Sequence, residues 1–143
     1  MNQEAVYTQS FRIKGGDFVN AGTVSVKIKK VLKEIGVKPE IVYKVSICCY
    51  EAEMNIVMYA EEANLDFTIT PEQIIVVIND KGPGIENIEM ALKEGFSTAT
   101  REMREMGFGA GMGLPNIKKN SDEFEIESVV SKGTKLQFKV NID

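Results

Sequence analysis

Apolar and polar residues alternate along four stretches of the chain, and each alternation predicts a β-strand with one buried face. The first stretch, 6–13, lies near the N-terminus, and the second, 65–70, lies in the middle of the chain. The last two, 124–130 and 136–142, form the arms of a hairpin that turns at Ser131-Lys132-Gly133. A fifth stretch, Ile74 to Ile78, is apolar and β-branched throughout. Such a run predicts a strand in the centre of the sheet.

Apolar residues at helical spacing predict two long helices between the first and second strands. The first would begin after Asp17 as its N-cap, include the apolar positions from Phe18 to Ile35, and end at Gly36. The second would begin at Pro39, whose missing N–H costs nothing in a first turn, and end near Ala60. Because its residues are apolar on almost every side, we expect the second helix to be largely buried.

Two shorter predicted helices, 86–93 and 114–120, flank a segment with little periodicity, 95–111. A loop of that length inside a compact domain is usually functional, and we expect a lid. The resulting order, β, α, α, β, β, α, lid, α, β, β, predicts an α+β fold, a two-layer sandwich with helices on one face of a mostly antiparallel sheet. The 143 residues contain no repeat or linker, so we expect one domain, 1–143.

Composition narrows the classes of function. Hydrophobic residues at 43% and charged residues at 27% argue against disorder, and the net charge of −4 argues against non-specific binding to nucleic acid or to an anionic membrane. No apolar run reaches the ~20 residues of a membrane span. Residues 1–4 lack the basic and apolar regions of a signal peptide, so we expect the protein in the cytoplasm.

Two residue types exclude further chemistry. The chain has no histidine, which excludes Ser-His-Asp and Cys-His sites and histidine-ligated metal clusters. Cys48 and Cys49 are adjacent within a helical pattern, which favours buried thiols over a disulfide or a metal site.

The first candidate for chemistry is a pair of polar residues on the second helix, Glu51 and Asn55. Four residues apart, their Cβ atoms should lie ~6 Å from each other on one face. An amide oxygen suits Mg²⁺, and the carboxylate beside it could accept a proton from a hydroxyl group or water. A solvated polar stripe is the alternative, but an unpaired acid on a mostly buried helix is costly.

The second candidate is the turn Asp80-Lys-Gly82-Pro-Gly84, directly after the apolar strand. An acid at the end of a buried strand can accept a hydrogen bond from an exocyclic amino group such as that of adenine. Gly82 and Gly84 would let the chain turn sharply and run beside a planar ring. An ordinary turn accounts for the same residues.

The third candidate is the run of alternating glycines from Gly107 through Gly109 and Gly111 to Gly113, directly before the last predicted helix. Alternating glycines destabilise regular structure, and the helix that follows them offers N-terminal amides to a phosphate. A flexible linker is the alternative. Neither G-x-x-x-x-G-K-[ST] nor G-x-G-x-x-G occurs, which excludes the P-loop and the dinucleotide motif. Thr134 could place a hydroxyl on the same site or simply begin a strand.

Together, the E-x-x-x-N helix, the D-x-G-x-G turn, the G-x-G-x-G run and the late Gly133-Thr134 resemble the sequence boxes of the GHKL (Bergerat-fold) ATPases. Over nearly its whole length, the chain is similar to the small anti-sigma-factor serine kinases of bacteria, of the RsbT, RsbW and SpoIIAB type. Residues 95–98 and 109–117 look closest to the RsbT-like branch. The charged stretch from Arg101 to Met106 departs from the family pattern.

The resemblance implies ATP and Mg²⁺ as cofactors. It assigns Asn55 as the Mg²⁺ ligand, Glu51 as the general base and Asp80 as the residue that reads adenine. It further implies that Gly82 and Gly84 shape the adenine pocket. The phosphates would be wrapped by Gly109, Gly111 and Gly113, and the adenine end would be supported by Thr134.

The activity that the resemblance implies is a serine/threonine protein kinase that acts on a STAS-domain protein. A sigma factor is a further implied partner, and a homodimer is an allowed assembly. Two other functions stay open: a nucleotide-gated anti-sigma or partner-binding protein with little phosphotransfer, and a stand-alone ATPase module.

Overall fold

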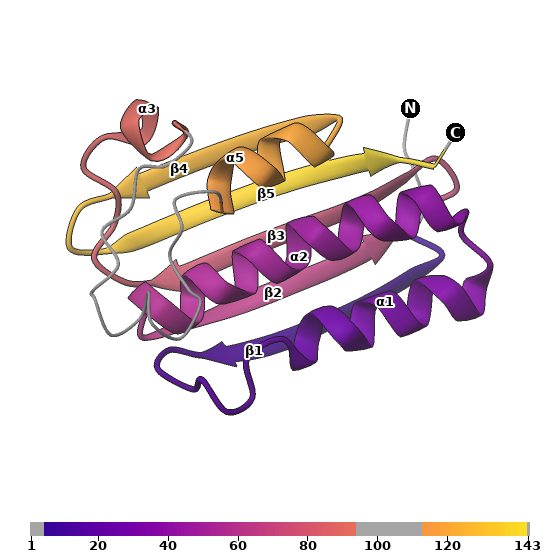
Figure 1. Ribbon diagram of the computed structural model, residues 1–143, viewed down its shortest axis with the longest axis horizontal. Coiled ribbons are helices and arrows are strands. Elements are labelled where there is room, and N and C mark those ends of the chain that lie inside the picture. Colours follow the sequence, from indigo (N-terminus) through magenta and orange to yellow (C-terminus); the bar gives the residue numbers. More distant parts are fainter. Residues whose placement is uncertain (1–4, 94–112, 143) are drawn as a thin grey trace.

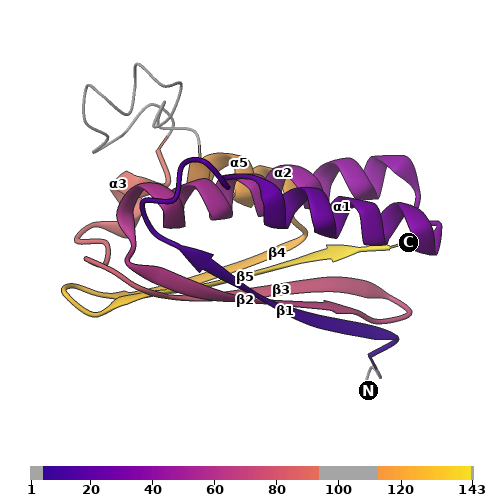
Figure 2. The same ribbon diagram turned by 90° about the horizontal axis from the view of Figure 1, so that it is seen from below.

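The computed structural model of the protein describes residues 5–93 and 113–142. Its elements are β1 (Tyr7–Lys14), α1 (Thr23–Ile35), α2 (Pro39–Tyr59), β2 (Glu62–Ile69), β3 (Gln73–Lys81), α3 (Ile88–Ala91), α5 (Gly113–Asn120), β4 (Glu123–Val129) and β5 (Gly133–Asn141). Helices α1, α2 and α5 lie on one face of the sheet (Figure 1, Figure 2). The predicted α+β class, with two layers, is confirmed.

The five strands form one sheet in the order β1-β2-β3-β5-β4, and every neighbouring pair is antiparallel. The apolar strand β3 lies in the centre, as predicted. On the face below the helices, Phe11 pairs with Leu65, Leu65 with Ile78, and Ile78 with Leu136. A slip of one residue would turn this row toward the opposite face, so the alternation of apolar residues fixes the register.

The core lies between the sheet and α2, the central helix, which has α1 on one side and α5 on the other (Figure 1). Val45, Cys48 and Cys49 on α2 are fully buried, which confirms that the cysteines are core thiols. Burial raises the pKa of the Cys48 thiol to about 12, so this thiol stays protonated at neutral pH. Within the described ranges, no helix is both long and apolar enough to span a membrane.

The opposite face of the sheet is mostly polar, apart from Ile75 and Val77 of the central strand β3. Ser10 Oγ donates a hydrogen bond to Asp66 Oδ1 across β1 and β2 (2.6 Å), and the Arg12 guanidinium pairs with Glu62 (2.8 Å). Cross-strand pairs of this kind suit a face in contact with water. The two faces of the sheet therefore differ, and the helix layer is the side on which the core forms.

The start of α1 differs from the prediction. The helix begins at Thr23 and not after Asp17, and its N-cap residue, Gly22, has a φ of 96° and no capping side chain. The Asp17 carboxylate instead accepts a hydrogen bond from the Asn20 side chain (2.9 Å), within a turn that precedes the helix. The prediction of Asp17 as the N-cap was wrong, because a short polar side chain also stabilises turns.

A buried glutamate of α2 takes over the capping of α1. Glu53 is 2% exposed, and its carboxylate accepts hydrogen bonds from the backbone amides of Gly22 (3.0 Å), Val24 (3.2 Å) and Ser25 (2.9 Å). These are amides that the first turn of a helix leaves unpaired. Glu53 therefore fixes the N-terminal end of α1 to the middle of α2.

The segment after β3 also departs from the prediction. The helix expected over 86–93 is the shorter α3, whose cap residue Asn87 accepts a hydrogen bond from Met90 N (3.1 Å). The predicted lid, 95–111, lies outside the described residues, as do Gly109 and Gly111.

Candidate functional site

Two residues of α2 and the first residue of α5 form one corner of the candidate site. A methyl group placed at Gly113 would lie 3.2 Å from Asn55 Oδ1 and 3.4 Å from Glu51 Oε2. A side chain there would press on both polar groups, so glycine lets the start of α5 lie directly against them. Because a helix N-terminus has unpaired N–H groups, this corner combines amide donors with a carboxylate and a carboxamide.

Glu51 is half-buried, which changes its acidity. Burial raises the pKa of the Glu51 carboxyl group above its ordinary value, and a smaller, opposite effect comes from a hydrogen bond with the Asn116 side chain. A carboxylate with a raised pKa is a stronger base than an exposed one, and such groups are frequent in active sites. Asn116 was not predicted as a site residue. Its position one turn after Gly113 on α5 was the available signal.

Asn55 offers an oxygen ligand. Within the part of the chain that the structure describes, its side chain makes no hydrogen bond, and it is only half-buried. No group of three or more His, Cys, Asp or Glu residues that could hold a metal is found among the described residues. A site with few protein oxygen ligands fits Mg²⁺, which usually keeps waters and nucleotide phosphates as its other ligands.

Asp80, at the end of β3, forms the second corner with the start of β5. Its Oδ1 accepts a hydrogen bond from the backbone amide of Thr134 (3.0 Å). Burial raises the pKa of the half-buried Asp80 carboxyl group, although this hydrogen bond lowers it in part. No described residue donates a hydrogen bond to Oδ2, so the carboxylate keeps one acceptor for a ligand.

Thr134 contributes to this corner through its backbone amide and its hydroxyl group. The hydroxyl is hydrogen bonded to Ser128 Oγ (2.8 Å), and Ser128 Oγ in turn accepts a hydrogen bond from Ile85 N (2.8 Å). Thr134 therefore lies in a hydrogen-bonded chain that joins the hairpin to the turn after Asp80. Ser128 was missed by the sequence reasoning, because its position in the alternating strand gives no sign of this contact.

The glycines after Asp80 let the turn pack closely against other backbone. Gly84 has a φ of 73°, and a methyl group there would lie 2.5 Å from the Val129 carbonyl oxygen. A methyl group at Gly82 would lie 3.2 Å from Ala60 Cα and 3.3 Å from Asp80 Oδ1. The Asp80 corner therefore lies against the C-terminal end of α2, the helix that carries Glu51 and Asn55.

The two corners are close in space. Ala60 directly follows α2 and is five residues beyond Asn55, a rise of about 8 Å along the helix axis. The described part of the chain thus brings together the predicted site residues on either side of this short span: Glu51, Asn55 and Gly113 at one corner, and Asp80, Gly82, Gly84 and Thr134 at the other.

The fold and the sequence boxes agree with one family. Residues 18–140 match the histidine kinase-like ATPase domain, so the chain belongs to that family. Within it, the relatives place the chain among the GHKL anti-sigma factors and serine kinases.

Two relatives and one solved structure support this assignment. The chain is 29% identical over 113 residues to the serine/threonine-protein kinase RsbT of Bacillus subtilis (strain 168), over 76% of this chain and 79% of that protein. It is 34% identical over 89 residues to the anti-sigma F factor of Caldanaerobacter subterraneus subsp. tengcongensis, over 59% of each.

The solved structure contains the RsbU and RsbW domains of a Mycobacterium tuberculosis protein. It superposes with a TM-score of 0.60 at 14% identity and covers 92% of this chain and 32% of that chain. This likeness shows the fold.

Proposed function

We propose that the chain binds Mg-ATP along the C-terminal part of α2. Adenine would lie at the Asp80 corner. There the Asp80 Oδ2 atom, which accepts no hydrogen bond from a described residue, can accept one from the exocyclic amino group of adenine. The phosphates would lie at the other corner, near the first amides of α5, and Gly109 and Gly111, which are outside the described residues, would contribute to binding them. The span of about 8 Å between Asn55 and Ala60 fits a ligand with a ring at one end and phosphates at the other. Membership of an ATPase-domain family supports this assignment.

Asn55 would hold the metal ion through Oδ1, because a neutral carboxamide with no partner among the described residues is a suitable ligand. When bound, Mg²⁺ neutralises charge on the phosphates. Gly113 keeps the start of α5 close to this group.

We further propose that the chain is a serine/threonine protein kinase whose substrate is a STAS-domain protein. The Glu51 carboxylate would accept the proton of the serine or threonine hydroxyl while the hydroxyl oxygen bonds to the γ-phosphorus and the bond to ADP breaks. The half-buried Glu51 carboxylate with its raised pKa, beside Asn55 and the start of α5, is the observation that carries this proposal. The similarity to the serine/threonine-protein kinase RsbT of Bacillus subtilis supports it.

A phosphotransfer assay tests the kinase proposal. The chain is incubated with radiolabelled Mg-ATP and a STAS-domain protein encoded in the same genome, and phosphoserine and phosphothreonine are measured on that protein. We expect Glu51→Ala to bind ATP normally and to transfer phosphate roughly 100-fold more slowly or worse, because a positioned base contributes that much. Equal rates of phosphate transfer by the variant and the original chain would contradict the proposal that Glu51 is the general base. Glu61→Ala, at an exposed position just after α2, is the matched control.

A second candidate function is a nucleotide-gated anti-sigma or partner-binding protein with little phosphotransfer. The names of several relatives, which are anti-sigma F factors, favour it. In this case a sigma factor or another regulatory protein would bind when ATP is present. Single-turnover experiments separate the two functions: ATP-dependent capture of the partner without phosphate on it supports binding, and rapid phosphorylation of the partner supports the kinase.

A further inference from the structure

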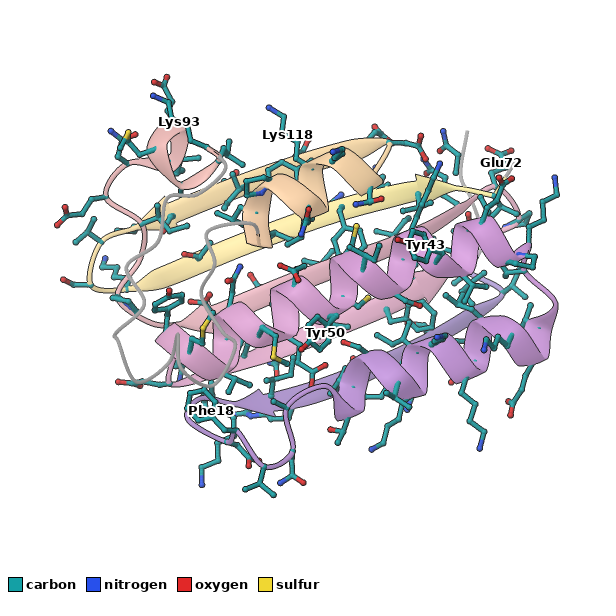
Figure 3. The ribbon with its side chains drawn as sticks, viewed as in Figure 1. Phe18, Tyr43, Tyr50, Glu72, Lys93 and Lys118 are labelled. Atoms are coloured by element: carbon teal, nitrogen blue, oxygen red, sulfur yellow. The ribbon has the colours of Figure 1, made fainter. Side chains whose placement is uncertain are left out.

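The outward side of the α1–α2 pair carries exposed apolar residues. Val26 on α1 is 66% exposed, and Tyr43 and Tyr50 on α2 are 65% and 45% exposed. The two tyrosines are seven residues apart, which places them two turns apart on one side of α2, and both are labelled along that helix in Figure 3. A methyl group at Gly22 would lie 3.7 Å from Tyr50 Cε1, so the Tyr50 ring reaches the start of α1. Val26 follows Gly22 by one turn.

Helix formation does not explain these side chains. Tyrosine and valine are poorer helix formers than lysine or glutamate, and Val26 and Tyr43, which are 66% and 65% exposed, gain little from burial within the chain. Aromatic residues are enriched in the centres of protein–protein interfaces. The residues on this side of the helix layer thus have the composition of an interface core.

The same helices carry a strong excess of positive charge. Between residues 23 and 59, six lysines are exposed, Lys27, Lys29, Lys30, Lys33, Lys38 and Lys44, against two exposed glutamates, Glu34 and Glu40. The net charge of the whole chain is −4, so the positive excess is local to this layer. By helical spacing from Ser25, which contacts Glu53 of α2, Lys29 and Lys33 lie on the side of α1 that adjoins α2.

We propose that this surface, Val26, Tyr43 and Tyr50 with Lys29 and Lys33, binds an acidic amphipathic helix of a partner protein. The tyrosines and Val26 would pack against the apolar stripe of that helix, and the lysines would pair with acidic residues at its edges. This docking site goes beyond the proposed phosphotransfer. Glu51 and Asn55 face α5, whereas Tyr50 reaches toward α1, so a docked partner would leave the start of α5 uncovered.

Other occupants fit this surface less well. In a symmetric dimer the patch would meet a second copy of itself, and the two exposed glutamates of these helices are too few to pair with six exposed lysines. Nucleic acid would attract the lysines through its phosphates but has no apolar stripe to cover Val26 and the tyrosines. An anionic membrane has both charge and apolar surface, and binding to vesicles tests that occupant separately. An acidic helix satisfies both the apolar residues and the lysines.

A designed peptide tests the proposal directly. The probe is a fluorescein-labelled amphipathic helix with leucines at helical spacing and glutamates elsewhere, and its counterpart carries lysines in place of the glutamates. We expect fluorescence anisotropy to show that the acidic peptide binds and that its affinity falls with added salt. The basic peptide should bind at least roughly tenfold more weakly than the acidic peptide. Equal binding of the two peptides, or no binding of the acidic one, would overturn the proposal.

Paired variants locate the site. Tyr43→Ser with Tyr50→Ser, and separately Lys29→Glu with Lys33→Glu, should each weaken binding of the acidic peptide roughly tenfold or more. Lys135→Glu, on the polar face of the sheet, is the matched control and should leave binding unchanged. Loss of binding in the control alone, or in none of the variants, contradicts the assignment.

The remaining outcomes are equally decisive. Patch-dependent binding to phosphatidylserine vesicles, or a patch-dependent dimer in light scattering, overturns the acidic-helix proposal in favour of that occupant. Calorimetry with Mg-ATP on the same variants should show unchanged affinity. A failure of the nucleotide proposal therefore appears in the ATP titration of the original chain, and a failure of the docking proposal appears in the peptide titration.

Discussion

Helix α2 carries two glutamates, two residues apart, whose surroundings differ. Glu53 is 2% exposed and accepts hydrogen bonds from three backbone amides and from the Ser25 hydroxyl (2.6 Å). Glu51 is half-buried, and burial raises its pKa, with Asn116 as the hydrogen-bonding side chain that opposes this effect. A separation of two residues turns the side chains by about 200°, to nearly opposite sides of the helix.

The difference separates an acid that stabilises the fold from the acid that we propose as the general base. A buried acidic side chain is tolerated when its hydrogen bonds are satisfied, as they are at Glu53, and it then contributes to the fold. A carboxylate that burial makes a stronger base, as at Glu51, is available to a ligand or a proton. Glu51 and Glu53 are the same residue type on the same helix, so it is their contacts that decide the role of each.

The largest expected difference between Glu53 and Glu51 is in their contribution to the free energy of unfolding. Glu53→Ala leaves the first amides of α1 and the Ser25 hydroxyl without their acceptor, so we expect a loss of about 3 kcal/mol in the free energy of unfolding. Urea denaturation followed by circular dichroism measures this loss. Glu51→Ala is the matched control and should change the unfolding free energy by less than about 1 kcal/mol. Similar losses for the two variants would erase the distinction between the two glutamates.

A smaller effect concerns the start of α5. Gly113→Ala places a methyl group 3.2 Å from Asn55 Oδ1 and 3.4 Å from Glu51 Oε2, so both side chains must move. We expect Mg-ATP to bind roughly tenfold more weakly, with little change in stability because alanine favours the helix. Titration calorimetry and thermal melting measure the two quantities.

Gly36→Ala gives the opposite pattern and serves as the control for Gly113→Ala. Gly36 ends α1 with a φ of 90° and has open space around it, away from the candidate site. A side chain there is strained, so we expect a loss of about 1 kcal/mol in stability and normal ATP affinity. Normal ATP affinity in Gly113→Ala as well would contradict the place of α5 in the site.

The smallest effect is on the pH dependence of stability. Burial raises the pKa of Glu51 above 4.5, its ordinary value, so the folded state holds this proton more tightly than the unfolded state does. Glu51 therefore favours folding in acid, and this contribution is lost as the pH rises through the folded-state pKa. Between about pH 4 and about pH 7, we expect Glu51→Gln to gain stability relative to the original chain.

Glu62→Gln should show the reverse dependence. A hydrogen bond from Arg12 is the largest of the effects that lower the pKa of Glu62 below 4.5, so Glu62 contributes stability above that pH and loses it in acid. The variant should therefore lose stability relative to the original chain as the pH rises. Urea unfolding across the same pH range measures both variants, and parallel curves would contradict the opposite signs of the two pKa shifts.

Much of the fold follows from local patterns in the sequence. The alternation that gives β2, β4 and β5, the apolar run of β3 and the glycine at the end of α1 are each readable within a few residues. The start of α1 cannot be predicted from nearby residues, because it is capped by Glu53, which is 28 residues away from Ser25 in the sequence. A local rule favours Asp17, and only the packing of α1 on α2 reveals the acceptor.

The candidate site shows the same limit. Glu51, Asn55 and Asp80 were predicted from their own segments, and the structure brings their segments together. Asn116 and Ser128 were missed, since each contacts the site through the packing of α5 or of the terminal hairpin. Sequence spacing indicates which residues can react, whereas contacts between distant segments show how they are held.

Titration calorimetry of Asp80→Asn with Mg-ATP tests the nucleotide site most directly. The asparagine oxygen can keep the hydrogen bond from Thr134 N, but the charged acceptor for the adenine amino group is lost. Asp66→Asn, on the polar face of the sheet, is the matched control. We predict roughly 100-fold weaker binding for Asp80→Asn, because a charge-assisted hydrogen bond is removed and a donor then faces a donor. Equal affinity for Asp80→Asn and the original chain would contradict the assignment of this site.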